Sequence, residues 1–211
     1  MNSLITEVLA LKKTIGLKVD ARLKEFKDFK YKNTEEWFSE LCFCILTANS
    51  KARTAIDIQE GLGFKGFSEM PEKKLSEHIK KKKHRFHNNK AKYIVLVRDY
   101  IDIKGIILGW IHEEGVLGAR EWLAHEVKGI GYKEASHFMR NVGFTDVAIL
   151  DRHIINLMIE NKIIKTKPKN LGKKNYLLLE AKFKELADQA NMSMAELDLY
   201  MWSMKGGDVL K

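Results

Sequence analysis

Helical periodicity runs through almost the whole chain, and this feature constrains the fold more than any other. Apolar residues recur at three- and four-residue spacing over residues 35–46 and 52–62, and a polar break at 47–50 separates the two stretches. No stretch shows the two-residue alternation typical of a half-buried strand. The other helical stretches that we predict cover residues 90–100, 105–113, 117–127, 132–142, 152–161, 173–190 and 193–204.

The sequence therefore predicts an all-α chain of about ten helices, without internal repeats. We expect Ser68 and Pro71 to open a further helix, because serine favours the cap position and proline the first turn. Residues 145–150 are expected to form a short extended link between two helices.

The charge balance narrows the class of partner. The chain has 211 residues, with 37 Lys and Arg against 28 Asp and Glu, so its net charge is +9. This surplus indicates a polyanionic partner, because clustered cations gain affinity by releasing counterions from phosphates. We expect no membrane span and no signal peptide, because no run of 18 apolar residues occurs and no basic segment leads into an apolar one at the amino terminus.

The two cysteines, Cys42 and Cys44, lie inside an apolar run. A redox pair or two metal ligands would explain them, but we interpret them as small core hydrophobes. A lone Cys-x-Cys cannot hold an iron–sulfur cluster, which needs four ligands. No cluster of His, Cys and carboxylate residues has the spacing of a catalytic metal site, so none is predicted.

Residues 80–85 form the strongest block of positive charge, and Phe86 follows at once. A solvated helix end explains the block, because the macrodipole favours cations at a carboxyl terminus. A phosphate-binding patch explains it equally well, and both explanations can hold together. The aromatic ring beside the basic run favours nucleic-acid contact, since bases stack on aromatic faces.

Two glycines, Gly129 and Gly131, flank Ile130 between a helix that ends near Lys128 and one that starts at once afterwards. Ile130 can point inward while the glycine backbones turn tightly. The unpaired N–H groups of the second helix can then hold a phosphate without base specificity. We therefore predict a hairpin that binds the DNA backbone.

Lys133 stands two residues after Gly131, in the first turn of the second helix. The macrodipole there disfavours the protonated amine, so the position suits a lysine nucleophile. An exposed lysine that reaches solvent or a phosphate is the alternative. Asp151 comes eighteen residues later at the start of a helix, where a plain helix cap would also explain it. Glu134 and Asp146 are the competing acids.

Residues 127–135, followed by Asp151, resemble the helix-hairpin-helix DNA glycosylase superfamily, whose relevant members carry a catalytic lysine and aspartate at this spacing. More narrowly, the whole chain resembles the archaeal-type 8-oxoguanine DNA glycosylase/AP lyases. The features that carry this narrower match are the turn at residues 46–50, the segment Arg85-Phe86, the late Trp202 and the final Lys211. Two departures from the pattern are Lys128 in place of a proline and a loop at 142–146 without proline.

The resemblance implies one unit over residues 1–211, a two-lobed helical bundle with the active site in the cleft between the lobes. The hairpin motif would cover about 117–142, and a central helical segment would form the second lobe. The implied activity is base-excision repair of 8-oxoguanine in duplex DNA, in the cytoplasm of a prokaryote at its nucleoid. Lys133 would attack the sugar C1′, Asp151 would stabilise the developing positive charge, and β-elimination would cleave the strand.

The resemblance also implies roles for residues outside the hairpin. Asn49 would enter the gap left by the flipped base and Arg53 would approach the orphaned cytosine, although a helix cap and a surface residue are the plain alternatives. Core packing is likewise the alternative for Trp202 and His137 of the expected base pocket, and a frayed tail is the alternative for its last residue. The pocket would comprise Phe86, His137, Trp202 and Lys211.

We expect no cofactor apart from a monovalent cation held by hairpin carbonyls, and double-stranded DNA with oxidised guanine as the partner of a monomer. Two alternatives remain open from the sequence. The enzyme could act on another oxidised base or only on abasic sites, with the same lysine and aspartate. The chain could instead be a non-enzymatic DNA clamp, but a clamp does not need the pair of Lys133 and Asp151.

Overall fold

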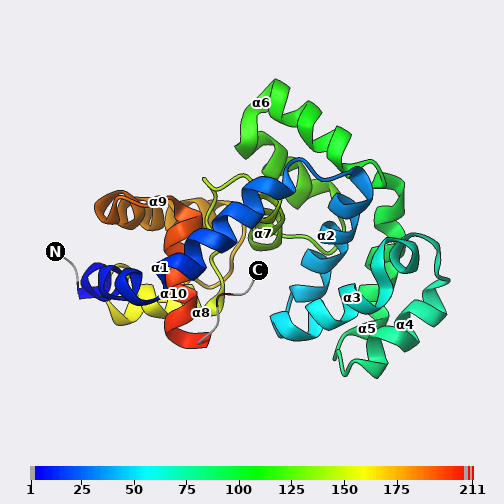
Figure 1. The fold of residues 1–211 in the computed structure, drawn as a ribbon, viewed down its shortest axis with the longest axis horizontal. Helices are drawn as coiled ribbons and strands as arrows, with labels where there is room; N and C mark the ends of the chain where they lie inside the picture. Colours follow the sequence, from blue (N-terminus) through cyan, green and yellow to red (C-terminus); the bar gives the residue numbers. More distant parts are fainter. Residues whose placement is uncertain (1–2, 207–208, 210) are drawn as a thin grey trace. The chain divides into compact units, whose positions relative to one another are not determined.

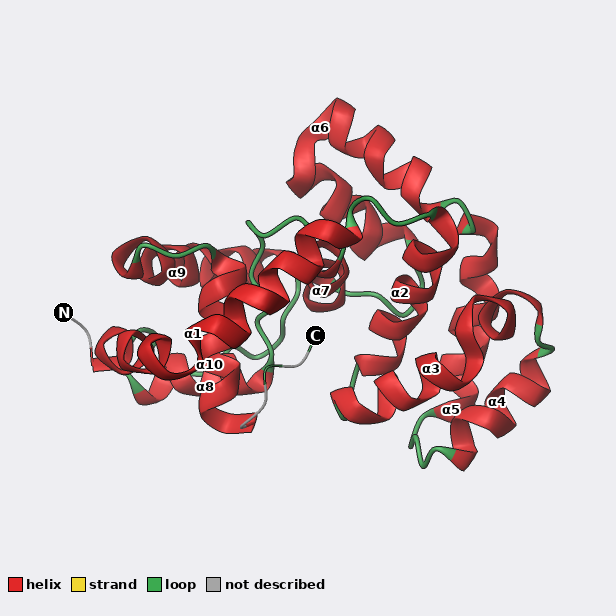
Figure 2. Cartoon of the chain, in the orientation of Figure 1, coloured by secondary structure: helices red, strands yellow, loops and turns green. Residues whose placement is uncertain are grey.

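The computed structural model describes residues 3–206, 209 and 211, and this part of the chain is helical without any strand (Figure 2). It confirms the all-α prediction. The helices divide into two compact units, formed by residues 1–30 with 139–211 and by residues 31–138. We call them unit 1 and unit 2.

Unit 1 is built around its last helix. α10 packs against three other helices of the unit (Figure 1). Leu197, Tyr200 and Met201 of α10 are buried. The helices of unit 1 are α1 (Ser3–Phe29), α8 (Arg152–Glu160), α9 (Lys173–Ala190) and α10 (Met194–Gly206).

Unit 2 is built around α2 (Thr34–Thr47), which packs against α3, α5 and α6. Asn33 caps α2 and forms a capping box with Glu36, and the helix is buried almost throughout its second half. Cys42 and Cys44 are buried there among apolar side chains, which agrees with their interpretation as core residues. The other elements are α3 (Ala52–Glu69), α4 (Glu72–Lys81), α5 (His87–Leu96), the 3-10 helix η1 (Val97–Tyr100) and α6 (Ile103–Glu126).

α7 (Tyr132–Asn141) follows the predicted hairpin and crosses the division between the units after Phe138. α6 contains Gly115 at φ 73°, so its two halves correspond to the two helices predicted over 105–113 and 117–127. The bounds predicted for α9 are those observed. Residues 145–150 form a link without regular structure, as predicted.

Two features differ from the sequence prediction. The sequence analysis predicts no helix over the residues of α1, which is the longest helix. Its apolar pattern is weak, because only five of its residues are buried and many of the others are lysines. Ser68 does not open a helix: it lies in the last turn of α3, and its hydroxyl donates to the carbonyl of Phe64 at 2.9 Å. Pro71 alone precedes α4, as its N-cap. Among residues 3–206, no helix is long and apolar enough to cross a membrane.

Candidate active site

The hairpin between α6 and α7 has the geometry that its glycines predicted. Val127 ends α6 by donating to the carbonyl of Leu123, and the N–H of Ile130 donates back to the carbonyl of Val127 at 3.1 Å. Ile130 is buried, as predicted for the residue between the two glycines. The buried Arg120 of α6 donates to Ser136 of α7 at 3.3 Å and ties the two helices together.

The two glycines differ in what they require. Gly129 has φ +90°, and a Cβ built there would lie 2.5 Å from Cδ2 of Tyr93 in α5. Gly131 has no left-handed backbone, and its Cβ would meet only the carboxylate of Glu134 at 3.5 Å. Gly129 is therefore needed for the fold of the hairpin, whereas Gly131 leaves an open approach to the amino end of α7.

Lys133 and Glu134 occupy the first turn of α7. Their side chains are 22% and 15% exposed, and Nζ of Lys133 lies 3.5 Å from Oε1 of Glu134. The other carboxylate oxygen of Glu134 accepts the N–H of Gly131 at 3.4 Å. A carboxylate at this position suits the positive end of the helix dipole, and it places a counter-charge beside the candidate nucleophile.

Sequence reasoning missed a buried lysine beside this pair. Lys90 of α5 is only 5% exposed, and its Nζ donates to the carbonyl of Ile45 near the end of α2 at 2.6 Å. Burial lowers the pKa of Lys90 to about 8; the charge of Glu134 raises it and that of Lys133 lowers it. The residue followed a polar run in the sequence, and its partner lies 45 positions earlier, so no local pattern revealed it.

His84 supports the same end of α2. Its Nε2 lies 2.9 Å from the carbonyl of Leu46, and its Nδ1 accepts the N–H of Phe86 at 3.2 Å. These partners require a neutral ring that carries its proton on Nε2. Burial lowers the pKa of His84, the bond to Leu46 opposes this effect, and the charge of Lys90 lowers the pKa further.

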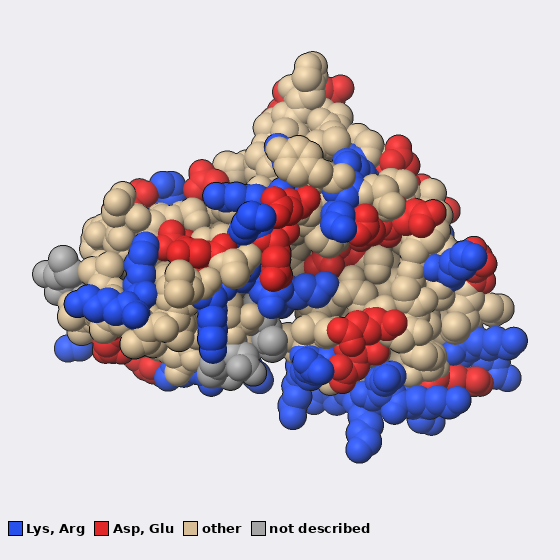
Figure 3. Space-filling model, viewed as in Figure 1, with Lys and Arg blue, Asp and Glu red and all other residues tan. Residues whose placement is uncertain are grey.

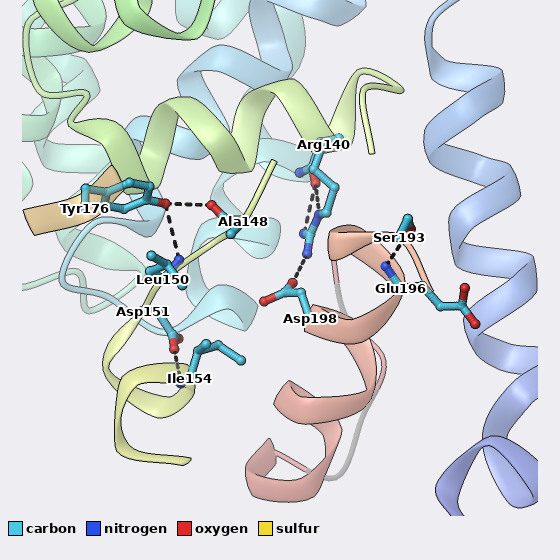
Figure 4. Close-up of polar contacts among 10 residues, drawn as sticks. Arg140, Ala148, Leu150, Asp151, Ile154, Tyr176, Ser193, Glu196 and Asp198 are labelled. Atoms are coloured by element: carbon cyan, nitrogen blue, oxygen red, sulfur yellow. Dashed lines mark hydrogen bonds and ion pairs between the residues drawn. The ribbon is translucent and has the colours of Figure 1, made fainter. Parts of the chain in front are cut away.

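Asp151 lies in unit 1 as the N-cap of α8. Its Oδ1 accepts the N–H group of His153 at 2.7 Å. The same oxygen accepts the N–H group of Ile154 at 2.9 Å (Figure 4). Asp151 therefore caps α8, as the alternative to a catalytic role predicts. Within the part of the chain that the structure describes, Oδ2 accepts no hydrogen bond, so one oxygen fixes the carboxylate and the other is available.

Side chains of α9 hold the link that leads to Asp151. Tyr176 donates its hydroxyl to the carbonyl of Ala148 at 2.6 Å and accepts the N–H of Leu150 at 3.3 Å (Figure 4). Glu180 accepts the N–H of Ala148 at 3.1 Å. Residues 147–150 of the link are buried, and these hydrogen bonds pair backbone groups of Ala148 and Leu150 without a strand.

A buried ion pair fixes the end of α7 in unit 1. Arg140 contacts Asp198 of α10 at 2.6 Å, and both side chains are almost completely buried (Figure 4). The guanidinium also donates to Asn141 and lies over the ring of Phe26 at 4.7 Å. The pair connects α7, α10 and α1, three segments far apart in the sequence.

The turn after α2 presents Asn49 to solvent. Asn49 is exposed at φ 60°, and it caps neither neighbouring helix, since Ala48 ends α2 and Lys51 precedes α3. Arg53 is 72% exposed and pairs with Asp57 one turn later at 3.2 Å. Both side chains therefore lie on the surface of unit 2, where DNA can reach them.

The residues expected in the base pocket fall into different environments. Phe86 is half-exposed, with the guanidinium of Arg85 over its ring at 4.6 Å. His137 is buried and meets Phe43 edge to face at 5.6 Å, an arrangement that core packing explains. Trp202 and Lys211 are partly exposed in unit 1.

Positive charge gathers at one end of unit 2. Lys and Arg side chains crowd the surface over α3, α4 and α5 in Figure 3. Residues 80–83 and Arg85 are all exposed there. Across residues 3–206, no three His, Cys, Asp or Glu side chains gather as a metal ion requires.

A family model described as 8-oxoguanine DNA glycosylase matches residues 19–192. The chain belongs to this family. The 8-oxoguanine DNA glycosylase/AP lyase of Methanocaldococcus jannaschii is 48% identical over 193 residues, which cover 92% of this chain and 91% of the relative. The protein of that name from Korarchaeum cryptofilum is 38% identical and covers this chain completely.

Solved structures agree with the family assignment. The glycosylase/lyase of M. jannaschii, in complex with a 15mer DNA containing 8-oxoguanine, matches with a TM-score of 0.95 and 46% identity over 99% of this chain and 100% of that one. The 8-oxoguanine DNA glycosylase of Thermotoga maritima matches with a TM-score of 0.92 and 35% identity, covering 99% of both chains. The resemblance inferred from the hairpin, Lys133 and Asp151 is confirmed.

Proposed function

We propose that this protein removes 8-oxoguanine from duplex DNA and then cleaves the strand at the abasic site. The observation that carries the proposal is the place of Lys133, in the first turn of α7 directly after the hairpin, in a chain whose relatives are named 8-oxoguanine DNA glycosylase/AP lyase. An amine at this position is only partly exposed and lies beside the backbone groups that would hold the strand.

Lys133 is the nucleophile in this proposal. Its neutral Nζ attacks C1′ of the sugar, and the glycosidic electron pair leaves with the base. Opening of the sugar then gives an imine between Nζ and C1′, which acidifies the proton on C2′. Loss of that proton expels the 3′ phosphate and cleaves the strand by β-elimination.

Asp151 stabilises the positive charge that develops on the sugar as the glycosidic bond breaks. Its carboxylate is held in one orientation through Oδ1, so Oδ2 can present a negative charge without reorganisation. The side chains of Tyr176 and Glu180 fix the backbone that carries it.

DNA is held mainly by its backbone. N–H groups at Gly129, Ile130, Gly131 and the amino end of α7 bind a phosphate, which positions the strand without reading sequence. Asn49 fills the gap left by the flipped nucleotide, and Arg53 exchanges Asp57 for the orphaned cytosine.

In this proposal Phe86 and Trp202 supply stacking faces for the flipped base, and His137 belongs to the same pocket. A carboxylate or carbonyl near Lys211 accepts the N7 hydrogen that distinguishes 8-oxoguanine from guanine. Deleting Lys211 should therefore reduce the preference for 8-oxoguanine over guanine in single-turnover excision. An unchanged preference would remove Lys211 from the pocket.

A monovalent cation at the hairpin fits the oxygen atoms present. The carbonyls of Val127 and Gly131 accept hydrogen bonds, whereas those of residues 128–130 accept none from the part of the chain that the structure describes. They are hard oxygen ligands, suited to such an ion. If it binds, affinity for undamaged duplex at constant ionic strength should differ between sodium, potassium and a bulky ammonium salt.

The test uses an end-labelled duplex with one 8-oxoguanine opposite cytosine and enzyme in excess. Quenching with hot alkali reveals base release, and neutral quenching reveals lyase cleavage. With the parent enzyme we expect cleaved strand after both the alkaline and the neutral quench. With Lys133→Gln we expect cleaved strand after neither quench. Faster release of an oxidised pyrimidine would favour another base specificity, and cleavage only at preformed abasic sites would indicate a lyase alone. Tight binding without either product would indicate a clamp.

We further propose that the protein acts as a monomer on DNA in the prokaryotic cytoplasm. One hairpin and one lysine suffice for a single flipped nucleotide, so no second copy is needed. Sedimentation with a short 8-oxoguanine duplex should give a complex of one chain and one duplex. Two chains on one duplex would contradict this.

A further inference from the structure

Lysines gather on the segment of unit 1 that joins α8 to α9 (Figure 1). Between Glu160 and Glu180 the sequence has six lysines and no acidic residue. All six are exposed, and they are Lys162, Lys165, Lys167, Lys169, Lys173 and Lys174. We call these six residues the unit 1 lysine patch. The hairpin and the basic block at residues 80–85 both belong to unit 2, so the patch is separate from them.

Most of the patch lacks the internal counter-charges that other exposed lysines of α9 have. Lys182 and Lys184 each pair with an acidic residue three or four positions later, at 2.8 Å and 2.6 Å. In the part of the chain that the structure describes, five patch lysines have no ion pair, namely Lys162, Lys165, Lys167, Lys169 and Lys174. Their charge is therefore available to an anion from outside the chain.

Two lysines of the patch also oppose the dipole of α9. Lys173 and Lys174 stand in its first turn, where the helix dipole disfavours a cation. This turn, which the structure describes in full, contains no acidic residue that would offset them. A polyanion bound beside these lysines relieves an unfavourable arrangement of charge that the chain does not relieve itself.

The segment that carries the patch is held at both ends by hydrogen bonds. The N–H of Ile163 donates to the carbonyl of Met158 in α8 at 2.8 Å. The side-chain oxygen of Asn170 accepts the N–H of Gly172 at 3.1 Å, and Asn175 of α9 donates to the carbonyl of Asn170 at 3.0 Å. Because these contacts already order the backbone, a ligand that binds the patch loses less entropy in ordering it.

We propose that the unit 1 lysine patch binds the phosphate backbone of duplex DNA, in addition to the contacts made by unit 2. Lysine ammonium groups act as point charges, so this contact reads neither the sequence nor the lesion. Thr166, Pro168 and Asn170 separate the central lysines, and their short side chains let a phosphate approach. The inference rests on the proposed function for duplex DNA as the partner, and it does not depend on the identity of the nucleophile.

An anionic membrane surface is the competing partner for such a patch. Leu171 and Leu178 are 38% and 61% exposed near the start of α9, and exposed leucines beside lysines suit a membrane interface. We favour DNA because residues 165–170 carry three lysines and no apolar side chain apart from Pro168, whereas interfacial binding needs a continuous apolar face.

The experiment compares two double variants that remove the same charge from unit 1. Lys167→Gln with Lys169→Gln removes two unpaired patch lysines. Lys182→Gln with Lys184→Gln is the matched control, because these exposed lysines are already paired within α9. Affinity for undamaged duplex is measured by fluorescence anisotropy between about 50 and 200 mM potassium chloride.

The patch variant should make the log–log salt slope shallower by about 1 to 2, because two phosphate contacts are lost. Over that range the parent should then lose about three- to twelvefold more affinity than the variant. The control should change the slope by less than half as much. In a Lys133→Gln background, which prevents turnover, a duplex with 8-oxoguanine should show the same change.

Equal slopes in the parent and the patch variant, or equal changes in the patch variant and the control, would overturn the inference. Tighter binding of the parent to phosphatidylglycerol vesicles than to duplex at the same salt would assign the patch to a membrane instead. Circular dichroism establishes folding, and Lys165→Gln with Lys174→Gln replaces the patch variant if it does not fold. The proposed function fails differently, since a parent that releases no base while the slopes still differ would lack the reaction but keep the contact.

Discussion

At the scale of single residues, the two hairpin glycines illustrate how similar positions can have different physical duties. Both were predicted from the Gly-x-Gly pattern. The structure shows that Gly129 adopts a left-handed backbone against Tyr93, whereas Gly131 has open space beside it. The fold of the hairpin should therefore depend on the first, and access to the amino end of α7 on the second.

Gly129→Ala should lower the free energy of unfolding by about 1–3 kcal/mol, because its Cβ clashes with Tyr93 and its backbone is strained. Gly131→Ala should leave stability within about 0.5 kcal/mol. Urea unfolding followed by circular dichroism measures both. Equal losses in the two variants would contradict the distinction.

Asp151 has two roles that one substitution can separate. Asparagine caps a helix as well as aspartate does, so Asp151→Asn should unfold within about 0.5 kcal/mol of the parent. The loss of charge should lower the single-turnover rate of base release at least about tenfold. A variant with the parent's rate would show that Asp151 serves only as a cap.

Residue patterns predicted those groups whose chemistry is local. The glycine spacing located the hairpin, and the resemblance to the glycosylase superfamily assigned roles to Lys133 and Asp151, which both stand at helix starts. Lys90 and His84 could not be found in this way, because each is defined by a carbonyl of α2 that lies tens of positions earlier. A lysine inside a basic stretch gives no sign in the sequence that it is buried.

At the scale of elements, the irregular link at residues 145–150 depends on a helix that follows it in the sequence. Its backbone has no strand partner, and Tyr176 and Glu180 of α9 supply the hydrogen bonds instead. The sequence predicted a link between two helices here but not the partners of that link. The helix α1 was also not predicted. Few of its side chains reach the core, and its exposed lysines obscure the apolar spacing.

Tyr176→Phe should lower the free energy of unfolding by about 1–3 kcal/mol, because it leaves buried groups of Ala148 and Leu150 without this partner. It should also slow base release, since the link carries Asp151. Tyr31→Phe is the control, because Tyr31 is 82% exposed. If Tyr176→Phe had the parent's free energy of unfolding and rate of base release, the link would not depend on the Tyr176 hydroxyl.

At the scale of the whole molecule, net charge and its distribution determine how the protein meets DNA. The charge of +9 is spread over both units, but the block at residues 80–85 gathers on unit 2 (Figure 3). Affinity for undamaged duplex should fall steeply with salt, with a log–log slope of about −0.9 for each phosphate neutralised.

A double variant, Lys81→Gln with Lys82→Gln, should make that slope shallower by about 1 to 2. Lys13→Gln with Lys18→Gln removes the same charge from exposed positions of α1 and should change the slope less. Fluorescence anisotropy over a range of potassium chloride concentrations gives both slopes. A flat profile in the parent, or equal changes in both variants, would contradict a phosphate-binding role for the block.

The most direct test of the central claim is borohydride trapping on a duplex with a single 8-oxoguanine. The parent and the control Lys128→Gln, altered at an exposed hairpin lysine, should form a covalent adduct, and peptide mapping should place it on Lys133. Lys133→Gln should form none. An adduct with Lys133→Gln would assign the nucleophile elsewhere, and base release by the parent without any adduct would show that no imine forms.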